Sequence, residues 1–576
     1  MSLNGIWELK KIALRNLARH KVKTVLTSAA IMISVAVYIF MSSWLGGMAV
    51  ESRRNIVNYD MSAAKLQTKL YFERKDELPS YENFKNWERY RDALNREGFN
   101  AAPRFVFNGT LFSNSGSAPM RFNAVDPAAE KSVLHYASYV DFGRYPQNGM
   151  FELAIGTTAA EKLRVGIPTR PRRLELEELI RQAAQSDTPN EEFIRSLYET
   201  ANMSGGLFNV AAETHIAGNE RMALKRNVSR GDLDRLWELI AATDRNNVRI
   251  NAVIDIKAVP ETIRPTLWEG ELMTSLREED KELVEAAYTY EEFIGVYLLT
   301  EEDEARKDQI LSAMIRAGFR GAVRHVNQLV DAVVVGVINS PDPVPNGNIG
   351  YIPIDVLQDE SGMMLEGAVT ELLIRRKDAP YTELPGADES SKAIAAALER
   401  GLGEPLPDYL AVFFWMDYMK DYLGYEALQT TAPQVLAALL LFISFLGISN
   451  TILLAVLERT KEIGMMRALG MTDRQMITAY MLEAGFLGFI GSVLGMILGC
   501  IVNYPMVEYG LNISAMADSL GNSGVGFRVT AIMRSVWNIP VIFGSGITAT
   551  VLASFMAYFP TRRAVKMPIT DSLRFE

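Results

Sequence analysis

Residues 433–507 have the sequence PQVLAALLLFISFLGISNTILLAVLERTKEIGMMRALGMTDRQMITAYMLEAGFLGFIGSVLGMILGCIVNYPMV, and this stretch decides the fold. It contains two long uncharged segments, 433–457 and 484–507, separated by a short loop that holds both acids and bases. A helix needs about 20 apolar residues to cross the ~30 Å hydrocarbon core of a bilayer. Both segments exceed that length, so the sequence predicts two membrane-spanning helices joined by a short charged connection.

Two more uncharged runs, 24–50 and 535–561, are equally long. A helix satisfies its own backbone hydrogen bonds in lipid, so four transmembrane helices are expected. The fold class is therefore an α-helical membrane protein with a large mixed α+β domain inserted between spans 1 and 2. The predicted segments are an amphipathic helix at 1–23, transmembrane helix 1 at 24–50, the inserted domain with helical stalks at 51–432, transmembrane helix 2 at 433–457, a charged connection at 458–474, transmembrane helix 3 at 475–507, a loop at 508–534, transmembrane helix 4 at 535–561 and a tail at 562–576.

The inserted domain has the mixed composition of a globular protein. Its expected core, 63–167 and 321–412, alternates strand and helix patterns, whereas the insertion 168–320 is charged and mostly helical. Strands are expected at 104–112, 120–125, 248–256, 332–338 and 369–374, and helices at 81–97, 174–184, 191–200, 232–242, 278–287, 301–317 and 390–400.

Lys and Arg near the spans predict the orientation. Fourteen of them lie in 1–23, 458–474 and 562–576, against seven on the other side of the predicted membrane. The positive-inside rule then places both termini and the charged connection in the cytoplasm, and the inserted domain outside. A cleaved signal peptide is the alternative for the first run, but that run is too long for one.

The composition excludes several function classes. The chain has 576 residues, a net charge of −10 and one cysteine, Cys500, so nucleic-acid binding and a disulfide framework are not expected. No Gly-Lys pair of a phosphate-binding loop, His-Glu-x-x-His, Cys-x-x-Cys or Gly-x-Ser-x-Gly occurs. We therefore expect no catalytic residue, no metal site and no cofactor bound by this chain, and an anchored enzyme is the weakest hypothesis.

The charged connection has the pattern of a short helical elbow. A helix over 459–469 is expected to end at Gly470, and Thr472 with Gln475 forms a capping box for the next helix. Ile463, Met466 and Leu469 should lie roughly on one side. A solvated linker is the simpler alternative, but a linker needs no apolar side, so a docking surface is favoured.

The third span carries a stripe of small residues. Gly485, Gly488, Gly491, Gly495 and Gly499 fall within one arc of the helix. Small residues on one face let helices approach closely. The stripe predicts a packing face, directed either at another helix of this chain or at a second copy.

The residues at 450–472, the Glu483-Ala484 pair, the glycine stripe and the ending at 560–576 resemble the FtsX-like permease domain of ABC transporters of the MacB/LolC/LolE kind. The match is specific at 450–500 and weak across 168–320. The resemblance implies a permease of the bacterial inner membrane that works as a homodimer or paralogous heterodimer. It also implies two copies of a separate ABC ATP-binding subunit, which would hold ATP and Mg²⁺.

By the same resemblance, the connection is the coupling helix that meets the ATPase. Its residues are Glu458, Arg459, Lys461, Glu462, Ile463, Gly464, Met465, Met466, Arg467, Ala468, Leu469 and Gly470. ATP hydrolysis would drive the periplasmic domain to move a lipoprotein or another periplasmic or outer-leaflet substrate, in contact with membrane lipid. The alternative is an FtsX-like signal transmitter that regulates cell-wall hydrolases.

Overall fold

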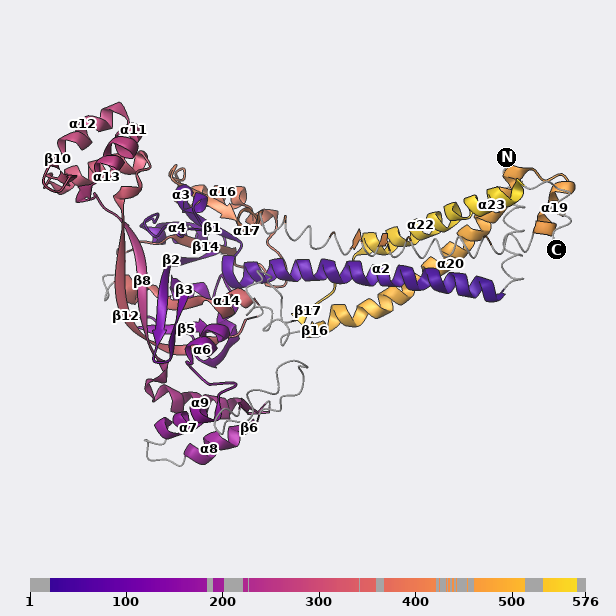
Figure 1. The fold of residues 1–576 in the computed structure, drawn as a ribbon, viewed down its shortest axis with the longest axis horizontal. Coiled ribbons are helices and arrows are strands. Elements are labelled where there is room, and N and C mark those ends of the chain that lie inside the picture. The colour runs from indigo at the N-terminus through magenta and orange to yellow at the C-terminus, as the bar shows by residue number, and fades with distance from the viewer. Residues whose placement is uncertain are drawn as a thin grey trace. The chain divides into compact units, whose positions relative to one another are not determined.

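The computed structural model describes residues 21–183, 190–200, 221–225, 227–340, 342–358, 367–420, 460–512 and 532–566, with isolated positions between 424 and 453 (Figure 1). The chain divides into two compact units. The apolar helical unit comprises Met1–Arg53, Met419–Asp518 and Thr530–Glu576. The α/β unit comprises Arg54–Tyr418 and Ser519–Val529.

Long helices dominate the apolar helical unit. Its described elements are α2 (Lys21–Ile56, whose last residues belong to the α/β unit), α19 (Thr460–Ala468), α20 (Asp473–Glu508), β16 (Leu511–Asn512), β17 (Ile532–Met533), α22 (Ile539–Met556) and α23 (Tyr558–Val565). Helix α22 begins four residues after the predicted start of its span. The Asn538 side chain accepts a hydrogen bond from the Val541 backbone N–H, and Pro540 occupies the first turn, so the helix starts at Ile539.

Three described helical segments are long and apolar enough to cross a membrane. They are Thr24–Met61, Asp473–Glu508 and Ile539–Val565, and they contain most or all of the first, third and fourth predicted spans. The second predicted span, 433–457, lies outside the described residues except for isolated positions, as do most of the helix expected at 1–23 and the end of the tail. Four spans therefore stay a prediction.

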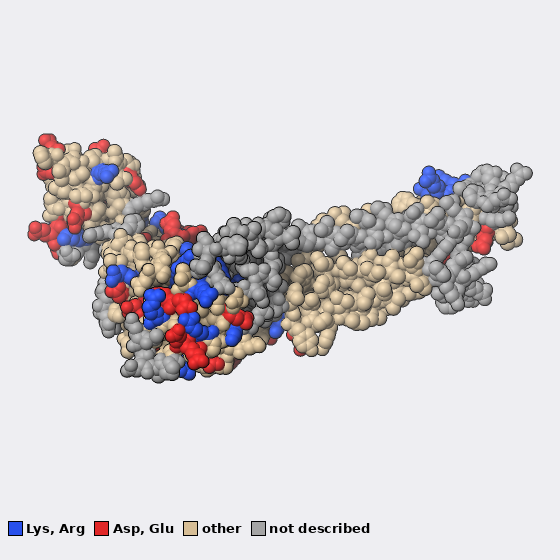
Figure 2. All heavy atoms as spheres, turned by 60° about the horizontal axis from the view of Figure 1, so that its bottom comes forward, with Lys and Arg blue, Asp and Glu red and all other residues tan. Residues whose placement is uncertain are grey.

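The exposed surface of these helices is apolar. Large apolar side chains point outward along each of them: Ile33 and Val37 on α2, Ile490, Leu494, Ile497 and Ile501 on α20, and Ile547, Val551 and Phe555 on α22. On the face that Figure 2 shows, the described part of these helices is largely free of charged side chains, whereas many charged side chains lie on the α/β unit. Exposed apolar surface on this scale is the property of a helix that faces lipid.

A ten-stranded sheet forms the centre of the α/β unit. Its order is β15-β1-β14-β2-β3-β13-β5-β12-β4, and β8 pairs with both β12 and β2. Six strands, β2, β3, β13, β5, β12 and β8, thus form a closed ring of pairings. The strand bounds are β1 (Ala64–Thr68), β2 (Phe99–Ser113), β3 (Gly116–Val125), β4 (Val140–Gly143), β5 (Glu152–Gly156), β8 (Asn247–Lys257), β12 (Val323–Ile338), β13 (Ile349–Pro353), β14 (Glu371–Arg376) and β15 (Leu410–Phe414).

The ring strands bury the main hydrophobic core. Phe107 on β2 and Phe122 on β3 are fully buried, and their rings stack with centroids 5.2 Å apart. Strand β12 begins nine residues before the predicted strand at 332–338. The residues Val323–Val333 of β12 pair with the whole length of β8, which extends the strand toward its N-terminus. The segment 168–320 was expected to be mostly helical, but it contributes the long strand β8 to the central sheet. Strand β8 covers the strand predicted at 248–256.

Helices and short strands surround this sheet. They are α3 (Lys69–Glu73), α4 (Trp87–Arg96), α5 (Pro127–Glu130), α6 (Thr157–Leu163), α7 (Arg173–Ala183), α8 (Asn190–Leu197), β6 (Tyr198–Thr200), β7 (Met222–Leu224), α9 (Arg230–Ala241), α14 (Pro343–Gly347), α15 (Ile354–Gln358), α16 (Ser391–Leu402) and α17 (Trp415–Tyr418). Helix α4 starts six residues after the predicted start at 81. Phe84 pairs with Val369 in a β-bridge and Asn86 has a left-handed φ of 58°, so neither residue is helical.

Residues 258–322 form a lobe with its own core between β8 and β12. Its elements are β9 (Thr262–Ile263), α10 (Pro265–Leu267), α11 (Met273–Ser275), α12 (Glu278–Ala286), β10 (Tyr288–Glu291), β11 (Val296–Leu299) and α13 (Glu304–Arg316). Trp268, Leu272 and Met314 are buried in a cluster that is separate from the core of the sheet. The lobe therefore has the packing of a small independent subdomain.

Candidate functional site

The predicted coupling segment forms the capped elbow that its sequence indicates. Helix α19 ends at Ala468, and Gly470 has a φ of 101°, a left-handed conformation that favours glycine. The Met471 N–H donates to the Met466 carbonyl, which closes the last turn. The Thr472 hydroxyl and the Gln475 side chain form the reciprocal bonds of a capping box. The chain therefore turns sharply between α19 and α20.

The apolar residues of α19 and of the turn after it differ in burial. Ile463 is fully buried in a cluster with Met476, Tyr480 and Val565 of the same unit. By contrast, Met465 is 50% exposed and Leu469 is 87% exposed. Ile463 was expected on the docking side together with Leu469, but in the structure it holds α19 against its own unit, and Met465 and Leu469 are exposed.

The other predicted coupling residues have less defined surroundings. Glu458, Arg459 and the side chain of Lys461 lie outside the described residues. Arg467 pairs with Asp473, with 3.3 Å between Nε and Oδ1. This ion pair joins the end of α19 to the start of α20, so Arg467 is engaged in the elbow itself. The role of these residues in coupling stays a prediction.

The glycine stripe on α20 packs against two helices of the same chain. A Cβ at Gly488 would lie 2.8 Å from Cβ of Ala553 on α22. At Gly491 and Gly495 the nearest atoms belong to α2, at 2.7 Å in both cases. Gly499 also faces α2, and Gly485 faces α22. The stripe is therefore a packing face within the chain, the first of the two alternatives that the sequence left open.

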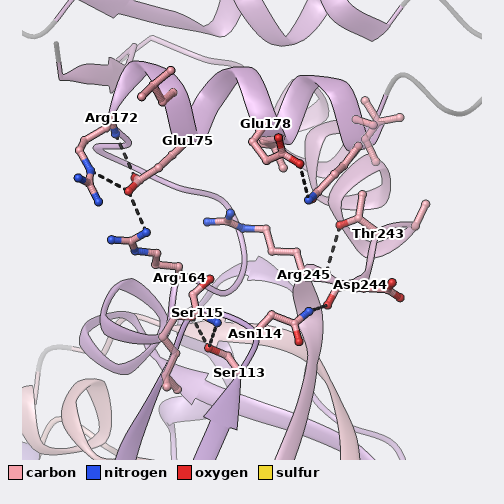
Figure 3. Close-up of a pocket in the computed structure, with 17 residues that line it drawn as sticks. Ser113, Asn114, Ser115, Arg164, Arg172, Glu175, Glu178, Thr243, Asp244 and Arg245 are labelled. Carbon is pink, nitrogen blue, oxygen red and sulfur yellow. Dashed lines mark hydrogen bonds and ion pairs between the residues drawn. The ribbon is translucent and has the colours of Figure 1, made fainter. Parts of the chain in front are cut away.

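The α/β unit contains a large polar cavity (Figure 3). Its volume is about 920 Å³, and it lies between the β2–β3 turn, the C-terminal end of α6, helix α7 and the segment after α9. Three arginines, Arg164, Arg172 and Arg245, line it together with leucines from α6, α7 and α9. No motif in the sequence marks this cavity, because its residues come from four separate segments.

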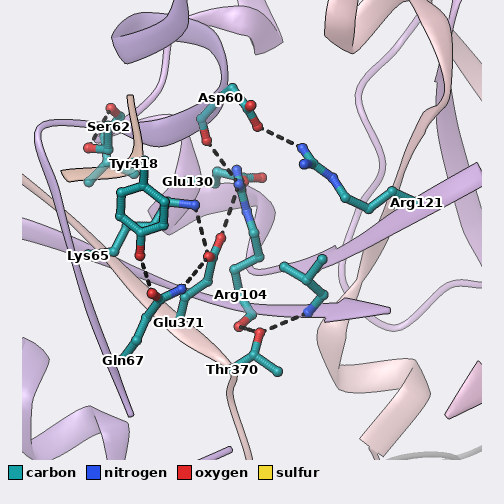
Figure 4. Close-up of polar contacts among 12 residues, drawn as sticks. Asp60, Ser62, Lys65, Gln67, Arg104, Arg121, Glu130, Thr370, Glu371 and Tyr418 are labelled. Atoms are coloured by element: carbon teal, nitrogen blue, oxygen red, sulfur yellow. Dashed lines mark hydrogen bonds and ion pairs between the residues drawn. The ribbon is translucent and has the colours of Figure 1, made fainter. Parts of the chain in front are cut away.

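A second polar site, within the α/β unit, is a cluster of buried charges around the turn that follows helix α2 (Figure 4). Helix α2 continues as a π-helical turn, Val57–Met61, that contains Asp60. Arg121 Nη2 lies 2.7 Å from Asp60 Oδ1, and Arg104 Nη1 donates to the Asp60 carbonyl at 3.1 Å. Both arginines belong to the central sheet. The last helical turn is thus attached to two neighbouring strands by its backbone and its side chain.

The cluster extends to strands β1 and β14. Arg104 also contacts Glu130 at 2.5 Å and Glu371 at 3.3 Å, and Lys65 lies 2.9 Å from the other oxygen of Glu371. The side chains of Arg104, Glu130 and Glu371 are 1–3% exposed. Burial alone would raise the pKa of Glu371, but the adjacent Lys65 and Arg104 outweigh it and lower that pKa. Each buried charge therefore has a partner of opposite sign.

Within the described ranges, no group of three or more His, Cys, Asp or Glu side chains is placed to hold a metal ion. His135 packs against the rings of Tyr59, Tyr139 and Tyr381, so it belongs to an aromatic cluster.

The long apolar helices and the large α/β unit define a membrane protein with a substantial domain outside the bilayer. Residues 435–569 match the family described as FtsX-like permease C-terminal. This region of the chain is therefore similar to the C-terminal part of the FtsX-like permeases, which supports the resemblance predicted from the sequence. The match covers the coupling elbow, the glycine stripe and α22.

Individual relatives agree with this assignment. The chain is 31% identical over 141 residues to an uncharacterised ABC transporter permease of Methanocaldococcus jannaschii, covering 24% of this chain and 31% of that protein. It is 32% identical over 135 residues to the ABC transporter permease YtrF of Bacillus subtilis, covering 23% and 30%. It is 25% identical over 138 residues to the macrolide export ATP-binding/permease protein MacB of Nitrobacter winogradskyi, covering 24% and 18%. The chain thus spans about a third or less of the length of these relatives.

Proposed function

We propose that this chain is the permease subunit of an ABC transporter and that separate ATP-binding subunits supply its energy. Two observations support the proposal. Residues 435–569 match the FtsX-like permease family, and the 576 residues contain no phosphate-binding loop. Two ATPase copies would hold ATP and Mg²⁺, and a second permease protomer, identical or paralogous, would complete the transporter. The transported molecule would be a lipoprotein or another substrate from the periplasm or the outer leaflet.

The observation that carries the proposal is the elbow at α19. A short helix holds its inner side chain, Ile463, in the unit's own core and presents Met465 and Leu469 to solvent. Exposed apolar side chains on a rigid, capped helix suit docking into a partner's groove. Surface ion pairs contribute only about 0–1 kcal/mol each, so the two apolar side chains would supply most of the docking energy.

The proposed path of energy begins where α19 packs on α20 and α23. Ile463 shares one cluster with Met476 of α20 and Val565 of α23, so a force on α19 reaches these helices directly. The helical segment Thr24–Met61 would then carry movement to the cluster at Asp60, where buried ion pairs fix its end to the sheet. This arrangement supports a permease whose cytoplasmic elbow drives its periplasmic domain.

The test is capture of the ATPase by the full chain purified in mild detergent from its host. We expect Leu469→Asp to reduce the co-purified ATP-binding subunit about 10–100-fold, since burial of a leucine contributes about 1.5–3 kcal/mol. Phe293→Asp is the matched control, because Phe293 is 93% exposed in the lobe and should have no effect. If Leu469→Asp captures as much ATPase as the unmodified chain, α19 is not the docking site.

A further inference from the structure

The cavity between the sheet and helix α7 has the features of a ligand site (Figure 3). At about 920 Å³ it is at the upper end of the size range of pockets that bind small molecules. One side is lined by apolar side chains, Leu163, Leu179 and Leu239, and the other by arginines. A cavity with this division suits a molecule that has an apolar part and a polar or charged end.

More positive than negative charge faces the cavity. Glu178 pairs with Arg181 at 2.7 Å, and Arg181 is not among the lining residues. Asp244 is exposed, and Figure 3 shows its carboxylate directed away from the centre of the cavity. Glu175 is then the one carboxylate among the described lining residues that faces the three arginines.

Glu175 is already engaged by two of them. Its carboxylate lies 2.9 Å from Arg164 and 2.9 Å from Arg172, and it also accepts a hydrogen bond from the Arg172 backbone N–H at 3.1 Å. These contacts lower the pKa of Glu175 although partial burial acts in the opposite direction. The single negative charge of Glu175 thus offsets one of the two guanidinium charges, so one positive charge remains before Arg245 is considered.

Arg245 brings a further charge into the same space. Its Nε donates to the Gly166 carbonyl at 3.0 Å, which fixes the side chain so that its two terminal nitrogens project into the cavity (Figure 3). Among the described residues, no carboxylate lies within ion-pair distance of it. Burial is the largest cause of the lowered pKa of Arg245, and Glu175 opposes that shift only at longer range. A partly buried guanidinium with free donors is costly unless an anion binds it.

We propose that this cavity is a binding site for an amphiphilic anion, a carboxylate or phosphate attached to an apolar group. The oxyanion would accept paired hydrogen bonds from the terminal nitrogens of Arg245, with Arg164 nearby. The apolar part would lie along the leucines of α6, α7 and α9. This goes beyond transport, because the site would bind its ligand whether or not that ligand is the transported molecule.

The experiment is titration calorimetry on the full chain in an uncharged maltoside detergent. The probes are hexyl phosphate and hexanoate, with hexylammonium and inorganic phosphate as comparisons. We expect at least one of the two amphiphilic anions to bind, and the tighter one identifies phosphate or carboxylate as the ligand's charged group. Equal binding of hexylammonium would overturn the proposal, and inorganic phosphate binding as tightly as hexyl phosphate would overturn the apolar half of it.

Variants separate a ligand site from a structural role. Arg245→Gln should weaken binding about 10–100-fold, the loss expected for charge-assisted hydrogen bonds, whereas Arg400→Gln, an exposed arginine outside the lining, should leave it unchanged. Glu175→Gln should tighten binding several-fold because it removes the competing carboxylate. Loss of packing alone would weaken binding in both variants, so unchanged binding with Arg245→Gln, or weaker binding with Glu175→Gln, would refute the assignment.

Discussion

Replacing Glu371 by glutamine should strongly destabilise the α/β unit. The Glu371 carboxylate is 3% exposed and is shared by Lys65 at 2.9 Å and Arg104 at 3.3 Å. Its neutralisation leaves Arg104 with Glu130 as its remaining carboxylate partner, and among the described residues it leaves Lys65 without one. Removal of one member of a buried ion pair typically costs about 3–5 kcal/mol, because the remaining charge stays desolvated.

This loss corresponds to a measurable shift in melting temperature. Unfolding entropy is about 2.1 cal/mol/K per residue, which gives roughly 0.8 kcal/mol/K for a unit the size of Arg54–Tyr418. We therefore expect Glu371→Gln to lower Tm by about 4–7 °C in a thermal-unfolding assay on the detergent-purified full chain. Glu404→Gln is the control, because Glu404 forms an ion pair with Arg89 at the surface and should change Tm by less than about 1 °C.

Acid should reveal the same interaction. The folded pKa of Glu371 lies below its ordinary value of 4.5, so this carboxylate contributes stability at higher pH that is lost as pH falls through the folded pKa. The Tm of the unmodified chain should then fall more steeply below about pH 4.5 than that of Glu371→Gln. The double variant Lys65→Met/Glu371→Gln no longer contains the unpaired Lys65 ammonium, so its Tm should be higher than that of Glu371→Gln. A Tm for Glu371→Gln within 1 °C of the unmodified chain would refute the reasoning.

Two further predictions concern packing. Gly495→Leu places a side chain where even a Cβ would lie 2.7 Å from the Met32 carbonyl oxygen, so this variant should lose cooperative unfolding of the apolar helical unit. Gly544→Leu should not, because among the described residues no atom outside the neighbouring turns of its own helix lies within 4 Å of its Cβ position. Comparable Tm values for the two variants would contradict the packing role of the stripe. Trp268→Ala removes about 3–5 kcal/mol of packing from the core of the lobe, so amide exchange should accelerate in 258–322 and stay slow in β2. Equal acceleration in β2 would show that the lobe does not open by itself.

Local patterns predicted the apolar helical unit well where it is described. The capping box at Thr472, the stop at Gly470 and the glycine face on α20 each depend on residues within a few positions of one another. Such features are encoded by helical spacing and backbone preference, so a single sequence reveals them. The direction of individual side chains was less predictable, because the burial of Ile463 depends on Val565, about 100 residues away in the chain.

The long-range pairings of the α/β unit were outside the reach of these patterns. The sequence predicted several of its strands, but the closed ring of pairings requires β8 to lie between β2 and β12, which are separated from each other by more than 200 residues. Strand length was underestimated for the same reason. Alternation of apolar and polar residues identifies a strand that has one buried face. The first part of β12 is held by backbone hydrogen bonds to β8, and this pairing leaves no such pattern in the sequence.

The buried ionic cluster shows the limit of alternation most clearly. All five residues of β1 are buried, yet Lys65, Gln67 and Thr68 are polar, and an alternating pattern assigns Lys65 and Gln67 to a solvated face. Their partner Glu371 lies about 300 residues away on β14. Glu130 comes from the short helix α5, and Asp60 comes from the π-helical turn after α2. Burial of these charges is tolerable only because each one finds its counterpart in the folded chain. A buried charge without its partner would cost several kcal/mol, so the cluster favours one position of the turn after α2 on the sheet.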